Sequence, residues 1–239
     1  PETIGQVLAG GAAACAAAGI PIAGGHSIDS VEAIYGLVAI GLVDPRLVLR
    51  NAAAREGDVL VLGKPLGVGV LSAALKKGAL GQSGYAAMIA STTLLNAAGP
   101  DLAALPGVHA MTDVTGFGLA GHALELARGS GLQVRIDWGA VPLLPQVREL
   151  AGQGFVTGAS GRNWAAYGAE VALAPGLTDL ERQLLTDPQT SGGLLVSCSP
   201  EAAGAVCDVF ARHGCDAGAV IGTVGPAPAA GEARLVVQP

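Results

Sequence analysis

The sequence predicts an α/β fold in which helices and a mixed sheet form an α+β sandwich. Patterns typical of helices and strands alternate along the chain, yet some predicted strands follow one another directly. This order favours a mixed sheet over a fully parallel, doubly wound one. Of the 239 residues, 51% are apolar and only 13% are charged, which predicts a substantial core. Because only 3% are aromatic, small aliphatic side chains must fill that core.

The amino-terminal quarter of the chain shows the weaker patterns. Residues 6–18 suit a helix of small residues, although two glycines weaken it. Residues 19–23 predict a short strand, and residues 32–43 form a β-rich run with glycines inside it. The charged stretch 44–58 has the composition of a connection. We therefore expect a domain boundary near residue 50.

The remaining chain predicts regular elements in close succession. Residues 199–214 have the best-marked ends, with Ser199 as the cap, Pro200 in the first turn and Gly214 as the stop. We also expect a long loop at 156–168. The other expected elements are a strand, turn and helix (58–78), helices (84–100, 118–129, 141–154 and 177–187) and strands (107–111, 132–137, 170–174, 194–198, 218–224 and 233–238).

Composition and charge exclude several classes of protein. The net charge is −6 and no long basic run occurs, so nucleic-acid binding through a basic face is not expected. The cysteines show no C-x-x-C spacing, which argues against a zinc site or a disulfide framework; they are Cys15, Cys198, Cys207 and Cys215. No segment resembles a membrane span or a signal peptide. We expect a soluble, cytoplasmic protein without a membrane partner.

The stretch MTDVTGFGLAGHALELA, residues 111–127, holds three glycines in the spacing G-x-G-x-x-G at the start of a predicted helix. This spacing is typical of dinucleotide-binding loops, and Asp137 ends the next strand where a ribose-binding acid would lie. Two features oppose that interpretation. Four residues separate the strand from the first glycine, and Asp113 would place a negative charge beside a pyrophosphate.

A bridging Mg²⁺ would make the charge of Asp113 favourable, because this cation binds carboxylate and phosphate oxygens together. A carboxylate at a strand tip, before glycines and a helix start, therefore fits a metal-bound phosphate. From the residues alone, a metal–phosphate loop, a dinucleotide loop and a plain structural turn all stay open. His122, Glu125 and Arg128 follow on the same predicted helix, and their spacing indicates a solvated stripe.

Three further stretches carry polar residues beside glycines. Residues 23–29, AGGHSID, allow close backbone approach and add donors from His26 and Ser27, although a tight turn accounts for them too. Residues 187–193, DPQTSGG, suit an anion-binding nest or a capped turn. Arg162 is either a phosphate clamp or a surface residue. Lys64 is followed by proline instead of Ser or Thr, which excludes a Walker A loop.

Five strings together resemble the selenophosphate synthetase family over essentially the whole chain. They are AGGHSID (23–29), GKPLGVGVL (63–71), MTDVTGFGLAGH (111–122), GRNWAAYG (161–168) and DPQTSGGLL (187–195). The resemblance implies an enzyme that converts ATP, selenide and water to selenophosphate, AMP and phosphate. It also implies a homodimer with the two-domain fold of aminoimidazole ribonucleotide synthetase.

Residue by residue, the resemblance implies that Asp113 binds Mg²⁺. It further implies that Gly25, His26 and Ser27 contact ATP across the dimer interface. The predicted domains then become a remnant of an ATP-binding, dimerising domain (1–44), a connection (45–57) and a synthetase-like α/β domain (58–239).

The sequence departs from the family in one respect. The nucleophile, its partner lysine, the glycine-rich ATP loop and further metal-binding aspartates precede the matched part, so we expect residues 1–239 alone to be inactive. Three alternatives remain. They are another ATP-using member of the superfamily (a thiamine-phosphate kinase or a hydrogenase-maturation protein), a non-catalytic dimerising fragment, and an NAD oxidoreductase.

Overall fold

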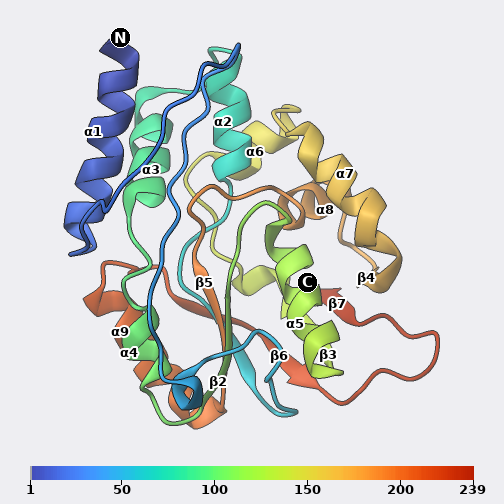
Figure 1. Cartoon of the computed structure of the whole chain (residues 1–239). Helices are drawn as coiled ribbons and strands as arrows, with labels where there is room; N and C mark the ends of the chain where they lie inside the picture. Colours follow the sequence, from blue (N-terminus) through green and yellow to red (C-terminus); the bar gives the residue numbers. More distant parts are fainter. Residues whose placement is uncertain (1) are drawn as a thin grey trace. The chain divides into compact units, whose positions relative to one another are not determined.

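A computed structural model describes residues 2–239 (Figure 1). The chain divides into two compact units, Pro1–Arg46 and Leu47–Pro239. Within the first unit, helix α1 (Glu2–Ala17) confirms the helix predicted at 6–18 and begins earlier. The strands predicted at 19–23 and 32–43 are wrong, since residues 18–44 contain no strand. A β-rich pattern forms a strand only where a neighbour pairs with its backbone groups, and no described residue does so here.

The second unit contains a seven-stranded mixed sheet, which confirms the predicted fold class. Its order is β2-β5-β1-β6-β3-β7-β4; the first five strands pair antiparallel, and β7 pairs parallel with β3 and β4. The strands are β1 (Val59–Leu62), β2 (Val108–Asp113), β3 (Gln133–Asp137), β4 (Val171–Leu173), β5 (Leu194–Cys198), β6 (Ala219–Gly225) and β7 (Leu235–Gln238).

Helices cover both faces of this sheet. The α-helices are α2 (Val68–Lys76), α3 (Gln82–Thr93), α4 (Gly99–Ala103), α5 (Gly118–Ser130), α6 (Val147–Gly152), α7 (Gly158–Tyr167), α8 (Asp179–Leu185) and α9 (Ala203–Arg212). Leu60 and Leu62 of β1 join a core with α2, α5, α6 and α8, whereas Val61 joins a second core with α4 and α9. Because successive side chains of β1 point to opposite faces of the sheet, this strand contributes to both cores.

Three predicted helix ends or loops are wrong. Gly99 and Pro100 begin α4 instead of ending the preceding helix, because proline suits the first turn of a helix. Ser199 makes no side-chain capping bond, and a short 3₁₀ turn, η4 (Pro200–Ala202), precedes α9. The long loop predicted at 156–168 contains α7. No helix among residues 2–239 has both the length and the apolar character needed to cross a membrane.

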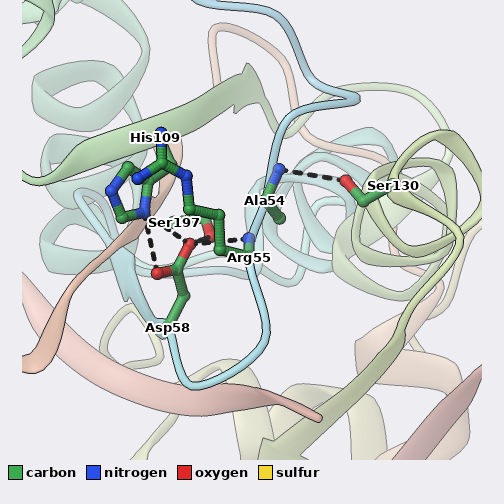
Figure 2. A network of polar contacts seen from close by, with 6 residues as sticks. All are labelled: Ala54, Arg55, Asp58, His109, Ser130 and Ser197. Atoms are coloured by element: carbon green, nitrogen blue, oxygen red, sulfur yellow. Dashed lines mark hydrogen bonds and ion pairs between the residues drawn. The ribbon is translucent and has the colours of Figure 1, made fainter. Parts of the chain in front are cut away.

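A buried carboxylate joins three neighbouring strands (Figure 2). Asp58 lies just before β1, and its Oδ2 accepts hydrogen bonds from Arg55 N at 3.0 Å and Ser197 Oγ at 2.6 Å. Its Oδ1 lies 2.8 Å from Nδ1 of His109 on β2. Because Ser197 belongs to β5, this network links the three neighbouring strands β2, β5 and β1 through one carboxylate.

Asp58→Asn should destabilise the fold. An amide keeps one acceptor oxygen but turns the other position into a donor, which then faces a donor of the network. We expect the free energy of unfolding to fall by about 1–3 kcal/mol, the usual cost of an unsatisfied buried polar group. Urea denaturation of residues 1–239 measures it, with the exposed Asp208→Asn as control. Equal stability of the two variants would contradict this role.

Candidate functional site

The strings that the sequence singled out in the second unit meet at one edge of the sheet. β5 runs antiparallel to β1 and β2, so its start lies beside the ends of both. We call residues 113–118 the Asp113 loop and residues 187–193 the 187–193 turn. Val114 N donates to Gly193 O at 2.9 Å, and Gln189 N donates to Thr115 O at 3.0 Å. These backbone bonds hold the loop and the turn together.

The 187–193 turn also holds the start of α2. The Oε1 atom of Gln189 accepts from Gly67 N and Val68 N at 3.1 and 3.2 Å. The Oδ2 atom of Asp187 accepts from the next two amides at 3.0 and 3.3 Å. These are the amides that a helix leaves unpaired at its amino end. Side chains of the protein therefore occupy this helix start, and the turn acts as a cap in the described chain.

Asp187 is fully buried and its Oδ1 has no hydrogen-bond partner among the described residues. Burial raises the pKa of Asp187 to about 7, which outweighs the opposing effect of the hydrogen bonds from Gln189 and the α2 amides. Its proximity to α2 leaves no room for a side chain at Gly69, where a methyl group would overlap the carboxylate.

Lys64 has a structural role, in agreement with the rejection of a Walker A loop. Its side chain is almost fully buried, and Nζ donates to the carbonyls of Leu94 at 2.5 Å, Ser191 at 2.8 Å and Ser91 at 3.3 Å. Two of these carbonyls lie at the carboxyl end of α3, where a cation is favourable. Burial lowers the pKa of the Lys64 amine.

Two side chains of helix α7 hold the Asp113 loop through hydrogen bonds to its carbonyl groups. Asn163 Nδ2 donates to Gly116 O at 2.9 Å, and Tyr167 Oη donates to Phe117 O at 2.5 Å. Gly118 has φ +70°, and a methyl group there would press on the backbone of α8. Close packing thus accounts for Gly118 and Gly121, whereas a side chain at Gly116 would meet nothing within 4 Å. Neither Asn163 nor Tyr167 was predicted as a supporting residue, because their segment has the composition of a loop.

Asp113 itself faces outward at the end of β2. It is exposed, and among residues 2–239 its carboxylate has no hydrogen-bond or ion-pair partner. No group of three potential metal ligands occurs in the described part of the chain. One free carboxylate beside a helix start suits a Mg²⁺ ion that takes its other ligands from phosphates and water. It does not form a closed protein site.

His122 is buried, in contrast to the predicted solvated stripe. It lies in the first half of α5, and its Nε2 is 3.2 Å from the Oγ1 of Thr115 in the Asp113 loop. Its Nδ1 has no hydrogen-bond partner among the described residues, although Oε2 of Glu125 lies 3.7 Å away. Burial lowers the pKa of His122, against the opposing charges of Asp113 and Glu125.

The residues predicted to contact ATP belong to the first unit. Gly25, His26 and Ser27 are exposed and lie in a stretch without helix or strand. A side chain at Gly25 would meet nothing within 4 Å. Their contact with ATP therefore stays a prediction. Arg162, on α7, is also exposed.

The sheet order opposes a dinucleotide site. In a dinucleotide fold the ribose-binding acid ends the strand next to the glycine loop. Here Asp137 ends β3, and three strands separate β3 from β2. With about 4.8 Å between neighbouring strands, Asp137 lies roughly 19 Å across the sheet from Asp113. Its Oδ1 instead accepts from Gly139 N at 3.1 Å and caps the turn η2 (Trp138–Ala140).

Comparison with known proteins gives one family and close relatives. Residues 55–232 match the family described as AIR synthase related protein, C-terminal domain. The proteins named selenide, water dikinase from Burkholderia orbicola (strain MC0-3) and Burkholderia pseudomallei (strain K96243) are 64% and 66% identical over 228 and 221 residues. The matches cover 95% and 92% of this chain but 64% and 62% of those relatives. The chain thus spans less than two thirds of their length.

A solved structure shows the same fold. The hydrogenase maturation protein HypE in complex with ATP matches with a TM-score of 0.55 and 23% identity. The match covers 77% of this chain and 47% of that chain. At this identity the likeness concerns the fold alone.

Proposed function

This chain belongs to the AIR synthase-related family by its carboxy-terminal domain, and from that premise we propose that it acts within a selenide, water dikinase. The proposed reaction converts ATP, selenide and water to selenophosphate, AMP and phosphate. The observation that carries the proposal is the identity of 57–66% to proteins of that name over most of this chain.

In this proposal the Asp113 loop holds the phosphates. Asp113 would supply one carboxylate oxygen to Mg²⁺, which neutralises phosphate charge when it is bound. The rigid support of the loop by Asn163, Tyr167 and the 187–193 turn fits such a role, because phosphoryl transfer depends on positioning and charge neutralisation. Gly25, His26 and Ser27 would contact ATP from the partner subunit of a homodimer.

The domain division at 1–44, 45–57 and 58–239, the homodimer and the cytoplasmic location stay predictions. So does the absence of a nucleic-acid partner.

Phosphorus NMR of the full-length protein with ATP, Mg²⁺ and selenide tests the proposed function. We expect selenide-dependent loss of ATP and a selenophosphate resonance. Parallel samples with thiamine monophosphate in place of selenide test the kinase alternative. A titration with NADH tests the oxidoreductase alternative. ATP loss that depends on thiamine monophosphate and not on selenide would overturn the proposal.

Residues 1–239 alone should make no selenophosphate. A single free carboxylate cannot both neutralise the phosphates and position the acceptor, and phosphoryl transfer requires both. The same phosphorus NMR assay on the isolated chain measures this, with the full-length protein as the positive control. A selenophosphate resonance above the protein-free background would show that the chain contains a complete site.

A further inference from the structure

Three polar side chains form a line from the Asp113 loop into α5. Thr115 is half-buried in the loop, and its Oγ1 lies 3.2 Å from Nε2 of His122. On the other side of the imidazole, Nδ1 lies 3.7 Å from Oε2 of Glu125. The His122 side chain is only 8% exposed, whereas that of Glu125 is 54% exposed. A hydroxyl, an imidazole and a carboxylate thus follow one another in space.

The contacts of His122 indicate which ring nitrogen carries the proton. The carboxylate of Glu125 can only accept, so its position 3.7 Å from Nδ1 favours the tautomer with the ring proton on Nδ1. Nε2 is then unprotonated and accepts from the hydroxyl of Thr115. Nδ1–H then faces the carboxylate of Glu125, and the charge of Asp113 also acts on the ring. Burial lowers the pKa of His122, against the opposing charges of Asp113 and Glu125, and so favours the neutral ring. A neutral imidazole that accepts from a hydroxyl is ready to take up a proton.

A purely structural role does not account for this geometry. A buried ring nitrogen without a hydrogen-bond partner costs stability, and an apolar side chain would fill the same space without that cost. The imidazole of His122 nevertheless faces the one hydroxyl that lies two residues beyond Asp113. Such an arrangement of hydroxyl, base and orienting carboxylate is typical of proton transfer at a reacting centre.

We infer that Thr115 and His122 relay the proton released by the water that receives a phosphoryl group. This inference rests on the proposed function, in which two phosphoryl groups leave ATP and only one goes to selenide. Water oxygen attacks the phosphorus, and the bond to the departing AMP oxygen breaks with its electron pair. The water proton passes to Thr115 Oγ1 while the hydroxyl proton passes to His122 Nε2. Glu125 stabilises the imidazolium that forms.

Four variants of the full-length protein separate this role from a structural one. Thr115→Val removes the hydroxyl at nearly constant volume, and Thr115→Ser retains it. His122→Gln can still donate an amide hydrogen bond to Thr115 but cannot accept the proton. Glu125→Gln removes the charge that stabilises the imidazolium. Thermal unfolding of each variant checks that the fold is retained.

The measurement separates the two phosphoryl transfers. Phosphorus NMR follows selenophosphate, ADP, AMP and phosphate in one sample. In Thr115→Val and His122→Gln we expect transfer to water to slow by about a hundredfold or more, the usual contribution of general base catalysis. Selenophosphate should still form, and ADP should accumulate in place of AMP. Thr115→Ser should retain AMP formation, and Glu125→Gln should lose only part of it.

Two results would overturn the inference. In one, His122→Gln makes AMP at the rate of the native protein. In the other, folded Thr115→Val loses both transfers equally, which indicates a general loss of phosphate binding. Failure of the proposed function looks different, because the native protein itself would then show no selenide-dependent transfer.

Discussion

Asp113→Asn is expected to lower the rate of ATP consumption by the full-length protein on the order of a hundredfold or more. A neutral amide oxygen is a poorer ligand for a hard cation than a carboxylate, so the charge of the transferring phosphoryl group is less well neutralised. The fold should be unaffected, because the native carboxylate is exposed and has no partner among residues 2–239. Mg²⁺ titrations of ATP consumption measure the loss.

Asp137→Asn is the matched control for this experiment. Asp137 also ends a strand that runs parallel to β2, but it lies across three intervening strands and caps only the turn at Gly139. It should leave the rate nearly unchanged. The dinucleotide alternative expects the reverse, since Asp137 would then hold a ribose. Severe loss in Asp137→Asn with normal activity in Asp113→Asn would falsify the metal–phosphate assignment.

The second large effect concerns stability and pH. Asp187 has a pKa of about 7 in the folded chain, against an ordinary aspartate pKa of 3.8. Between these values the unfolded chain loses the proton while the folded chain keeps it. The stability that protonated Asp187 gives the fold is therefore fully present below about pH 4 and is lost as the pH rises through 7. At 1.36 kcal/mol per pKa unit, the loss is about 4 kcal/mol.

Asp187→Asn should remove this dependence, because an amide does not titrate. We expect the free energy of unfolding of residues 1–239 to vary much less between pH 5 and pH 8 than in the native chain. Urea denaturation at several pH values measures it, and the exposed Asp216→Asn serves as control. An unchanged pH profile in Asp187→Asn would show that another group causes the decline.

The sequence predicted the mixed sheet because most of its strands are dense apolar runs. Such a run can be recognised without knowing which strand it pairs with. The run at 32–43 carried a similar pattern and failed, because pairing partners cannot be read from one segment. Helix α7 was missed for the opposite reason. Its glycines lower helix propensity, but Thr157 caps it and Asn163 and Tyr167 anchor it to the Asp113 loop. Tertiary contacts outweighed propensity.

The candidate site shows the same limit. Asp113 was singled out because a carboxylate at a strand tip, before glycines and a helix start, is typical of metal-bound phosphate. Its contact with a metal ion stays a prediction. His122 was assigned to solvent because its spacing to Glu125 and Arg128 looked like a polar stripe. The structure instead turns the imidazole toward Thr115 and beneath the loop. Nor did the sequence reveal that Asp187 caps α2, which lies more than a hundred residues earlier.

The strand order has a consequence for how the chain folds during its synthesis on the ribosome. Among the strands that the structure describes, β2 pairs only with β5, and β5 follows some eighty residues later in the chain. Such non-local pairing is slow to form, because closing a long loop costs entropy before the stabilising contacts are made. During synthesis, the Asp113 loop therefore lacks its bond to Gly193 and the pairing of β2 with β5 until residues 193–198 have left the ribosome. A nascent chain stalled before residue 194 should be open to proteases at this loop, and one stalled well after residue 198 should be protected.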